Sequence, residues 1–163
     1  MVNFANLATA AAAASISIVD HTQTFAVDLV NGDCQNLNPV QQFSRLQSVN
    51  QQWNLNSVAP NVFRITNAKC GTILSFAGSD SGALGIRAQP VSLSQSDMTW
   101  TVTPVDPSNP VGAFRFIENV SGHGFALTAW ANDPSIEAGT APLTLEPNRP
   151  NDPRQSFFIT TPL

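Results

Sequence analysis

The feature of this sequence that most constrains its fold is an internal repeat. A strand pattern rich in β-branched and aromatic residues, a polar turn and a second apolar strand follow one another three times. The first strand of each copy is Ile16-Ser17-Ile18, Phe63-Arg64-Ile65 and Phe114-Arg115-Phe116. A large aromatic residue closes each copy, and we expect these three residues in the core: Trp53, Trp100 and Phe157. A repeat of roughly 50 residues predicts three similar units that bury one common core.

The other patterns in the sequence favour an all-β chain. Twelve prolines would interrupt most candidate helices, and outside one Ala-rich stretch no apolar 3.6-residue period lasts for three turns. Three units of about four short strands are too few for a propeller, which typically has four to eight blades. A closed barrel removes the exposed sheet edges on which other chains could pair. We therefore predict a β-trefoil with three four-stranded repeats of about 50 residues and pseudo-threefold symmetry.

The chain divides into a short leader and one domain. We expect an Ala-rich leader at residues 1–14 and a single domain at 15–163, with repeats at about 15–57, 58–105 and 110–163. The leader is predicted to form a short helical turn because Ala has the highest helix propensity. It does not match a secretory signal peptide, because no Lys or Arg precedes its apolar part. The sequence therefore leaves the compartment open between the cytoplasm and secretion.

The composition excludes several classes of function. Charged residues make up 11% of the chain and hydrophobic residues 42%, which excludes a disordered acidic chain. The formal net charge is −4 and the seven Lys and Arg residues are scattered, so we expect no binding of nucleic acid. No apolar run approaches the ~20 residues that span a bilayer, so we expect no membrane insertion.

One stretch of the first repeat carries a sugar-binding pattern. Val27-Asp28-Leu29 is followed by Phe43 near the end of the third strand, and Asn50-Gln51-Gln52-Trp53 ends the unit. This order of Asp, aromatic residue and Asn-Gln-x-Trp resembles the repeats of ricin B-chain-like lectins, most closely the mushroom (fungal) branch. The resemblance covers residues 16–161. It implies a β-trefoil that binds galactose or N-acetylgalactosamine.

The same residues suit a galactose-type ring on chemical grounds. Phe43 can cover the apolar C–H face of the sugar, and Asp28 can accept charge-assisted hydrogen bonds from two neighbouring hydroxyls. Asn50 offers a donor and an acceptor to the same edge, and Gln51 either adds to that contact or braces Asp28 from behind. Gly32 lets the main chain approach closely. We predict a non-catalytic lectin with these five carbohydrate-binding residues.

Structural roles remain open for each of these side chains. Asp28 can instead cap a turn through a bond to the backbone. Phe43 can serve only to pack, and Asn50 and Gln51 can brace their loop without touching a sugar. Phe43 also gives a smaller platform than the Trp or Tyr that the resemblance leads one to expect, which predicts a weaker or more selective site.

The second and third repeats depart from the pattern. Ser75 stands near the Asp position of the second repeat, and Thr128 stands there in the third. Neither repeat combines a carboxylate with a stacking ring in the expected places. Trp130 and Asn132 make a possible second site in the third repeat, although packing of Trp130 as a lid over the barrel is the favoured interpretation.

The remaining reactive residues suggest neither an active site nor a cofactor. His21 and His123 fall in equivalent turns of the first and third repeats, which threefold geometry would hold apart. We find no acidic pair placed for glycoside hydrolysis and no metal-binding motif, so we predict no enzyme and no bound metal. Cys34 and Cys70 either form one disulfide or remain free, largely buried thiols.

A protease inhibitor is the alternative from a different functional class. Some mushroom β-trefoils that resemble this chain inhibit serine or cysteine proteases through an exposed loop. Three segments rich in Pro and Asn are stiff enough to present such a loop, at residues 59–61, 104–110 and 147–153. A module of a glycoside hydrolase is less favoured, because the chain begins with Met and ends shortly after its last strand.

The expected partners of the lectin are glycans or glycoconjugates. One shallow site binds a monosaccharide weakly, so useful avidity on a cell surface requires several sites in one particle. We therefore expect a homodimer or a higher oligomer.

Overall fold

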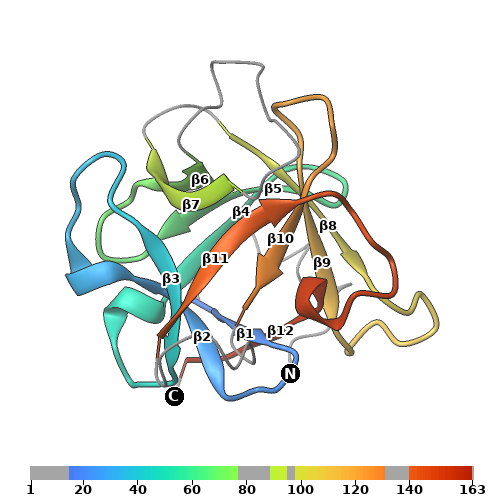
Figure 1. Ribbon diagram of the computed structural model, residues 1–163, viewed down its shortest axis with the longest axis horizontal. Helices are drawn as coiled ribbons and strands as arrows, with labels where there is room; N and C mark the ends of the chain where they lie inside the picture. The colour runs from blue at the N-terminus through green and yellow to red at the C-terminus, as the bar shows by residue number, and fades with distance from the viewer. Residues whose placement is uncertain (1–14, 77–88, 95–97, 131–139, 163) are drawn as a thin grey trace.

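The computed structural model describes residues 15–76, 89–94, 98–130 and 140–162 (Figure 1). Within these ranges the chain forms strands joined by turns and by three single 3-10 turns, and no α-helix occurs. The strands are β1 (Ser17–Asp20), β2 (Phe25–Leu29), β3 (Val40–Ser44), β4 (Trp53–Ala59), β5 (Val62–Asn67), β6 (Ile73–Phe76), β7 (Gln89–Ser94), β8 (Trp100–Pro104), β9 (Phe114–Glu118), β10 (Ala126–Ala129), β11 (Thr140–Glu146) and β12 (Phe157–Thr160). The 3-10 turns are η1 (Val30–Gly32), η2 (Val49–Gln51) and η3 (Pro153–Gln155). The all-β prediction is confirmed, and the predicted leader lies outside the described residues.

The strands pair antiparallel into a closed barrel with three further hairpins. The barrel runs β1–β12–β9–β8–β5–β4, and a bridge between Ile16 and Trp53 closes it. The hairpins are β2–β3, β6–β7 and β10–β11, and β11 pairs with both β3 and β7. Because β3 is paired on both sides, its side chains are presented from a fixed backbone. The predicted division into three symmetric repeats stays a prediction.

The aromatic residues that close the repeats lie in the core. Trp53, Trp100 and Phe157 are fully buried, as predicted. The indole N–H groups of Trp53 and Trp100 donate to the carbonyls of Val27 and Leu74, each at 2.9 Å. A buried indole N–H needs such a partner, and here the partner also fastens a barrel strand to the hairpin strand above it.

A buried acceptor holds each polar turn that follows the first strand of a repeat. Asp20, Asn67 and Glu118 end β1, β5 and β9, and each accepts backbone N–H groups from its own turn. Burial alone would raise the pKa of Glu118, but hydrogen bonds from Ser121 and from backbone N–H groups outweigh burial and lower this pKa. These turns are therefore fixed to the barrel rather than loose.

The structure resolves the sequence prediction about the two cysteines. Cys34 and Cys70 form a disulfide with Cα atoms 5.3 Å apart, and Cys34 is exposed, so the alternative of free, largely buried thiols is wrong.

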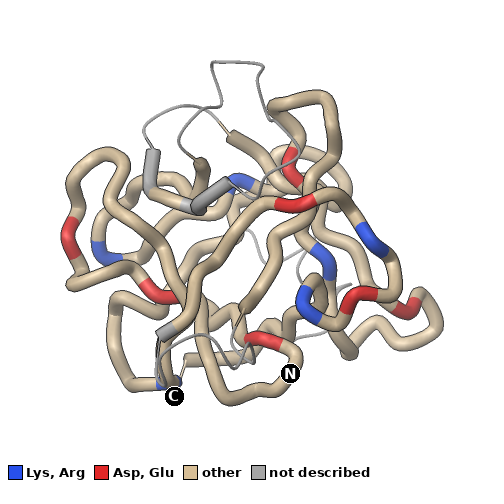
Figure 2. The backbone as a smooth tube through the Cα atoms, in the orientation of Figure 1, with Lys and Arg blue, Asp and Glu red and all other residues tan. Residues whose placement is uncertain are grey.

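Figure 2 shows Lys and Arg on opposite sides of the molecule, several of them near Asp or Glu. Among the described residues, no helix has the length and hydropathy of a transmembrane span.

Candidate functional site

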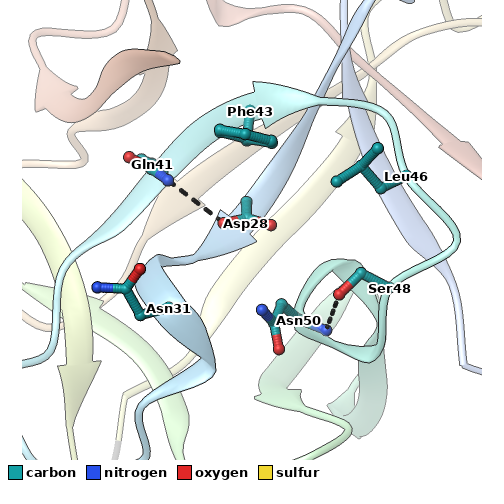
Figure 3. Close-up of a pocket in the computed structure, with 7 residues that line it drawn as sticks. All are labelled: Asp28, Asn31, Gln41, Phe43, Leu46, Ser48 and Asn50. Atoms are coloured by element: carbon teal, nitrogen blue, oxygen red, sulfur yellow. Dashed lines mark hydrogen bonds between the residues drawn. The ribbon is translucent and has the colours of Figure 1, made fainter. Parts of the chain in front are cut away.

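Three of the five predicted site residues of the first repeat, Asp28, Phe43 and Asn50, meet at an open pocket of about 180 Å³ (Figure 3). Asp28 lies in the middle of the view, with Phe43 and Leu46 on one side and Asn31 and Asn50 on the other. The pocket therefore has an apolar side and a polar side around one carboxylate. Its full lining is Asp28, Asn31, Gln41, Phe43, Leu46, Ser48 and Asn50.

Asp28 supplies the carboxylate of the pocket from β2. It is 6% exposed and accepts from the Nε2 atoms of Gln51 at 3.1 Å and Gln41 at 3.4 Å. Its partners are thus side-chain amides, rather than the backbone N–H groups that a turn cap would bind. Burial raises the pKa of Asp28, and the hydrogen bonds from Gln51 and Gln41 oppose that rise. Since a carboxylate has about four acceptor positions, both oxygens can accept further bonds from a ligand.

Gln51 stands behind Asp28 and does not line the pocket. Its Nε2 donates to Asp28 and also to the carbonyl of Ser44 at 2.9 Å, while its Oε1 accepts from the N–H of Leu46 at 2.8 Å. The side chain is 1% exposed, so the whole amide is used inside the protein. This position favours the bracing role of Gln51 over direct contact with a ligand.

Gly32 and Asn50 are packed against each other at the edge of the pocket. Gly32 has φ +61°, a conformation that favours glycine, and a Cβ there would lie 2.4 Å from Oδ1 of Asn50. The hydroxyl of Ser48 accepts from the N–H of Asn50 at 3.2 Å and thereby caps η2. Gly32 is buried and supports Asn50 instead of lining the pocket itself.

Phe43 provides the apolar platform from β3. It is half-buried, and its ring is drawn on the pocket side of the strand in Figure 3. Its backbone pairs with Ala26 of β2 and with Thr140 of β11, which fixes its position. Leu46 lies beside it in the pocket with 51% of its surface exposed and extends the apolar side.

Four lining residues were not predicted from the sequence. Gln41 is two positions before Phe43, so the period-two alternation of a strand places both on one face and could have revealed it. Asn31 has φ +54°, which Asn tolerates better than most residues, and the Asn31-Gly32 pair is a signal for such a turn. Leu46 and Ser48 lie in an irregular connection with no periodic signal.

The third repeat contains the same frame around Gln155. Its Nε2 donates to Oγ1 of Thr128 at 3.1 Å and to the carbonyl of Pro147 at 3.0 Å, and its Oε1 accepts from the N–H of Arg149 at 2.7 Å. These three bonds match those of Gln51. By this correspondence Thr128 stands where the first repeat has Asp28, and Glu146 stands where it has the aromatic platform.

Charged side chains occupy the region around this second frame. Arg154 binds Asp152 at 2.7 Å and lies 3.8 Å from Glu146, which Arg149 also approaches at 3.5 Å. The guanidinium of Arg154 lies 4.6 Å from the ring centre of Trp130 and covers one face of the indole. Asn132, the other predicted residue of the possible second site, lies outside the described residues.

The other residues considered for chemistry lie away from the pocket lining. His21 and His123 are not among the lining residues, and His123 is exposed. Within the described ranges, no group of three or more His, Cys, Asp and Glu residues is placed to hold a metal ion.

Solved structures resemble this chain over almost its whole length. ThreeFoil, a designed protein with threefold symmetry, matches with a TM-score of 0.72 at 16% identity, over 90% of this chain and 97% of that one. The fold is a β-trefoil. No protein-family model and no curated protein sequence matches the chain.

Two fungal lectins share the β-trefoil fold of this chain. The Macrolepiota procera ricin B-like lectin, solved in complex with lactose, matches with a TM-score of 0.69 at 18% identity, over 93% of this chain and 98% of that one. The Rhizoctonia solani agglutinin matches with a TM-score of 0.68 at 19% identity, over 92% and 96%. The resemblance to ricin B-like lectins of the fungal branch is confirmed for the fold.

Proposed function

We propose that this chain is a non-catalytic lectin that binds a galactose-type glycan in the first-repeat pocket. The observation that carries the proposal is the meeting of Asp28, Phe43 and Asn50 at one open pocket. A pyranose has a hydroxyl edge and an apolar C–H face, and these three side chains are complementary to both. The lactose in the structurally similar Macrolepiota procera lectin supports the same class of ligand.

The axial 4-hydroxyl of galactose suits this arrangement better than the equatorial group of glucose. It leaves a continuous C–H patch on the opposite face of the ring, and Phe43 would cover that patch. The neighbouring 3- and 4-hydroxyls would donate to the two oxygens of Asp28, while Asn50 would bond the same edge. N-acetylgalactosamine carries the same two hydroxyls, so we propose both sugars as ligands.

We also propose that the twelve strands form three four-stranded units and that the first unit carries the principal site. The repeated indole bonds and the matching frames of Gln51 and Gln155 support this symmetry. The possible second site at Trp130 would need Arg154 to leave the indole face.

With one principal site per chain, useful avidity requires a homodimer or a higher oligomer. A strict monomer in light scattering that still agglutinates cells would contradict this part of the proposal.

Calorimetric titration with lactose and with N-acetylgalactosamine tests the proposed ligand. Asp28→Ala should weaken lactose binding about a hundredfold or more, because hydrogen bonds to a charged group contribute about 1.5–3 kcal/mol each. Cellobiose, which has no galactose ring, should give no heat at the same concentrations.

Ser75→Ala is the matched control for Asp28→Ala. Ser75 stands at the corresponding place of β6 and is fully buried, and its hydroxyl has no hydrogen-bond partner among the described residues, so its loss should cost little stability. The control should bind lactose like the unmodified protein. If this protein binds no galactoside but inhibits trypsin or papain, the protease-inhibitor hypothesis replaces the lectin hypothesis.

A further inference from the structure

One turn of the second repeat makes three separate connections to the pocket of the first. Residues 67–71, which we call the brace turn, join β5 to β6. Nζ of Lys69 donates to the carbonyl of Gly32 at 2.7 Å, and Cys70 forms the disulfide with Cys34. Nδ2 of Asn67 donates to the carbonyl of Asn50 at 3.2 Å. The first two connections hold the loop of η1, and the third holds η2.

The brace turn is itself firmly attached to the barrel. Asn67 ends β5 and is fully buried, and its Oδ1 accepts from the N–H groups of Lys69 and Cys70 at 3.0 and 3.3 Å. The N–H of Ala68 donates to the carbonyl of Gln52 at 2.8 Å. The turn can therefore serve as a fixed support for segments that lie outside the barrel.

The loop that begins with η1 has little support from the core. Asn31 and residues 33–37 are exposed, and Asn31 also contributes to the pocket lining. Gly32 holds a left-handed backbone conformation that the free chain would seldom maintain in one place. A wall of this kind binds a ligand well only when it is held in place beforehand, because ordering it on binding would cost free energy.

We propose that the brace turn positions the pocket: Lys69 and Cys70 hold the η1 wall that carries Asn31, and Asn67 holds Asn50. None of the three lines the pocket, so they act through other residues and are positioning residues. The proposal rests on the proposed function, because it concerns the affinity of the same pocket for a galactoside. It assigns to the second repeat a role in the site of the first.

Two independent variants test the brace. Lys69→Met removes the donor to Gly32 and keeps an unbranched side chain that is one atom shorter, and the double variant Cys34→Ser with Cys70→Ser removes the disulfide. Each should weaken lactose binding about tenfold, which for Lys69→Met is the size of one lost hydrogen bond to a charged group. Each should also speed amide hydrogen exchange at residues 30–34 in the absence of sugar. Lys69→Arg, which keeps a cationic donor, should restore most of the affinity.

The controls separate positioning from general stability. His123→Ala changes an exposed residue in the corresponding turn between β9 and β10 and should alter neither measurement. Lactose affinity and exchange at residues 30–34 that stay unchanged in both variants would overturn the proposal. So would a lowered melting temperature with unchanged lactose affinity.

The exchange measurement also keeps the two proposals distinguishable. If the unmodified protein binds no galactoside, the proposed function fails. Faster exchange at residues 30–34 in the variants would then still support the brace, and unchanged exchange would overturn it independently.

Discussion

The first and third repeats build the same frame and fill it with different side chains. Gln51 and Gln155 each bind one hydrogen-bond acceptor on the strand beside them, one backbone carbonyl and one backbone N–H. Around Gln51 the frame presents a carboxylate and an aromatic ring, whereas around Gln155 it presents Thr128 and a cluster of ion pairs. The frame therefore stabilises the fold, and the residues placed on it differ in whether they suit the proposed sugar ligand.

Replacing Gln51 and Gln155 one at a time should give the largest effect on stability. The two variants also separate stabilisation of the fold from ligand binding. Each glutamine is buried and makes three hydrogen bonds, so Gln51→Ala and Gln155→Ala should each lower the free energy of unfolding by about 2–4 kcal/mol. Only Gln51→Ala should also weaken lactose binding, because Asp28 loses its brace. Urea unfolding and lactose titration measure the two effects. Equal loss of lactose binding in both variants would contradict the difference between the repeats.

Gly32→Ala should give the next largest effect. The new Cβ would lie 2.4 Å from Oδ1 of Asn50, and the backbone has φ +61°. We expect a loss of about 1–2 kcal/mol in the free energy of unfolding, together with weaker lactose binding as Asn50 is displaced. Gly122 has φ +74° and open space around it, so Gly122→Ala isolates the backbone strain. That control should lower stability and leave lactose affinity unchanged.

As the pH is lowered, lactose should dissociate from the pocket before the barrel unfolds. Burial raises the pKa of Asp28, so its ionised form costs stability, and this cost disappears as the pH falls through the raised pKa. Lactose affinity should fall in the same range, by about tenfold for each pH unit below that pKa. The pKa of Glu118 is lowered, so its stabilising contribution is lost only at lower pH. Lactose titrations and Trp fluorescence at stepped pH should show two separate transitions, and a single shared transition would contradict this order.

Arg154→Ala should give the smallest effect on stability. It also tests whether the third repeat can bind lactose as the first repeat is proposed to do. It removes the guanidinium from the face of Trp130 and the ion pair with Asp152, both partly exposed. We expect a loss of about 0.5–1 kcal/mol in the free energy of unfolding. The stoichiometry in calorimetry should remain one lactose per chain. Two lactose molecules per chain would indicate that Arg154 had masked a second platform at Trp130.

Periodic features of the fold and site could be predicted from the sequence. The closing aromatics Trp53, Trp100 and Phe157 lie in the core because a large ring at the same place of each repeat fills a shared interior. Asp28 and Phe43 were predicted from residue order, and strand geometry brings them to one face of paired strands.

Features that do not follow the repeat or a side-chain period could not be predicted in this way. The disulfide joins Cys34 and Cys70 at non-equivalent points of two repeats, so comparing one repeat with the next gives no signal for it. Leu46 enters the pocket through an irregular connection in which no side-chain period operates. The sequence leaves Gln51 with two roles, and only its hydrogen bonds to Asp28 and to the carbonyl of Ser44 distinguish a brace from a ligand contact.

The disulfide of the brace has a consequence for the environment in which the protein works. Its Cys34 end is exposed, so small thiols can reach the bond while the aromatic interior stays closed. Such bonds persist outside the cell and are rare in reducing cytosol. Reduction of the bond would release the η1 loop from the brace turn, so the proposed affinity for a galactoside would be higher in oxidising than in reducing surroundings.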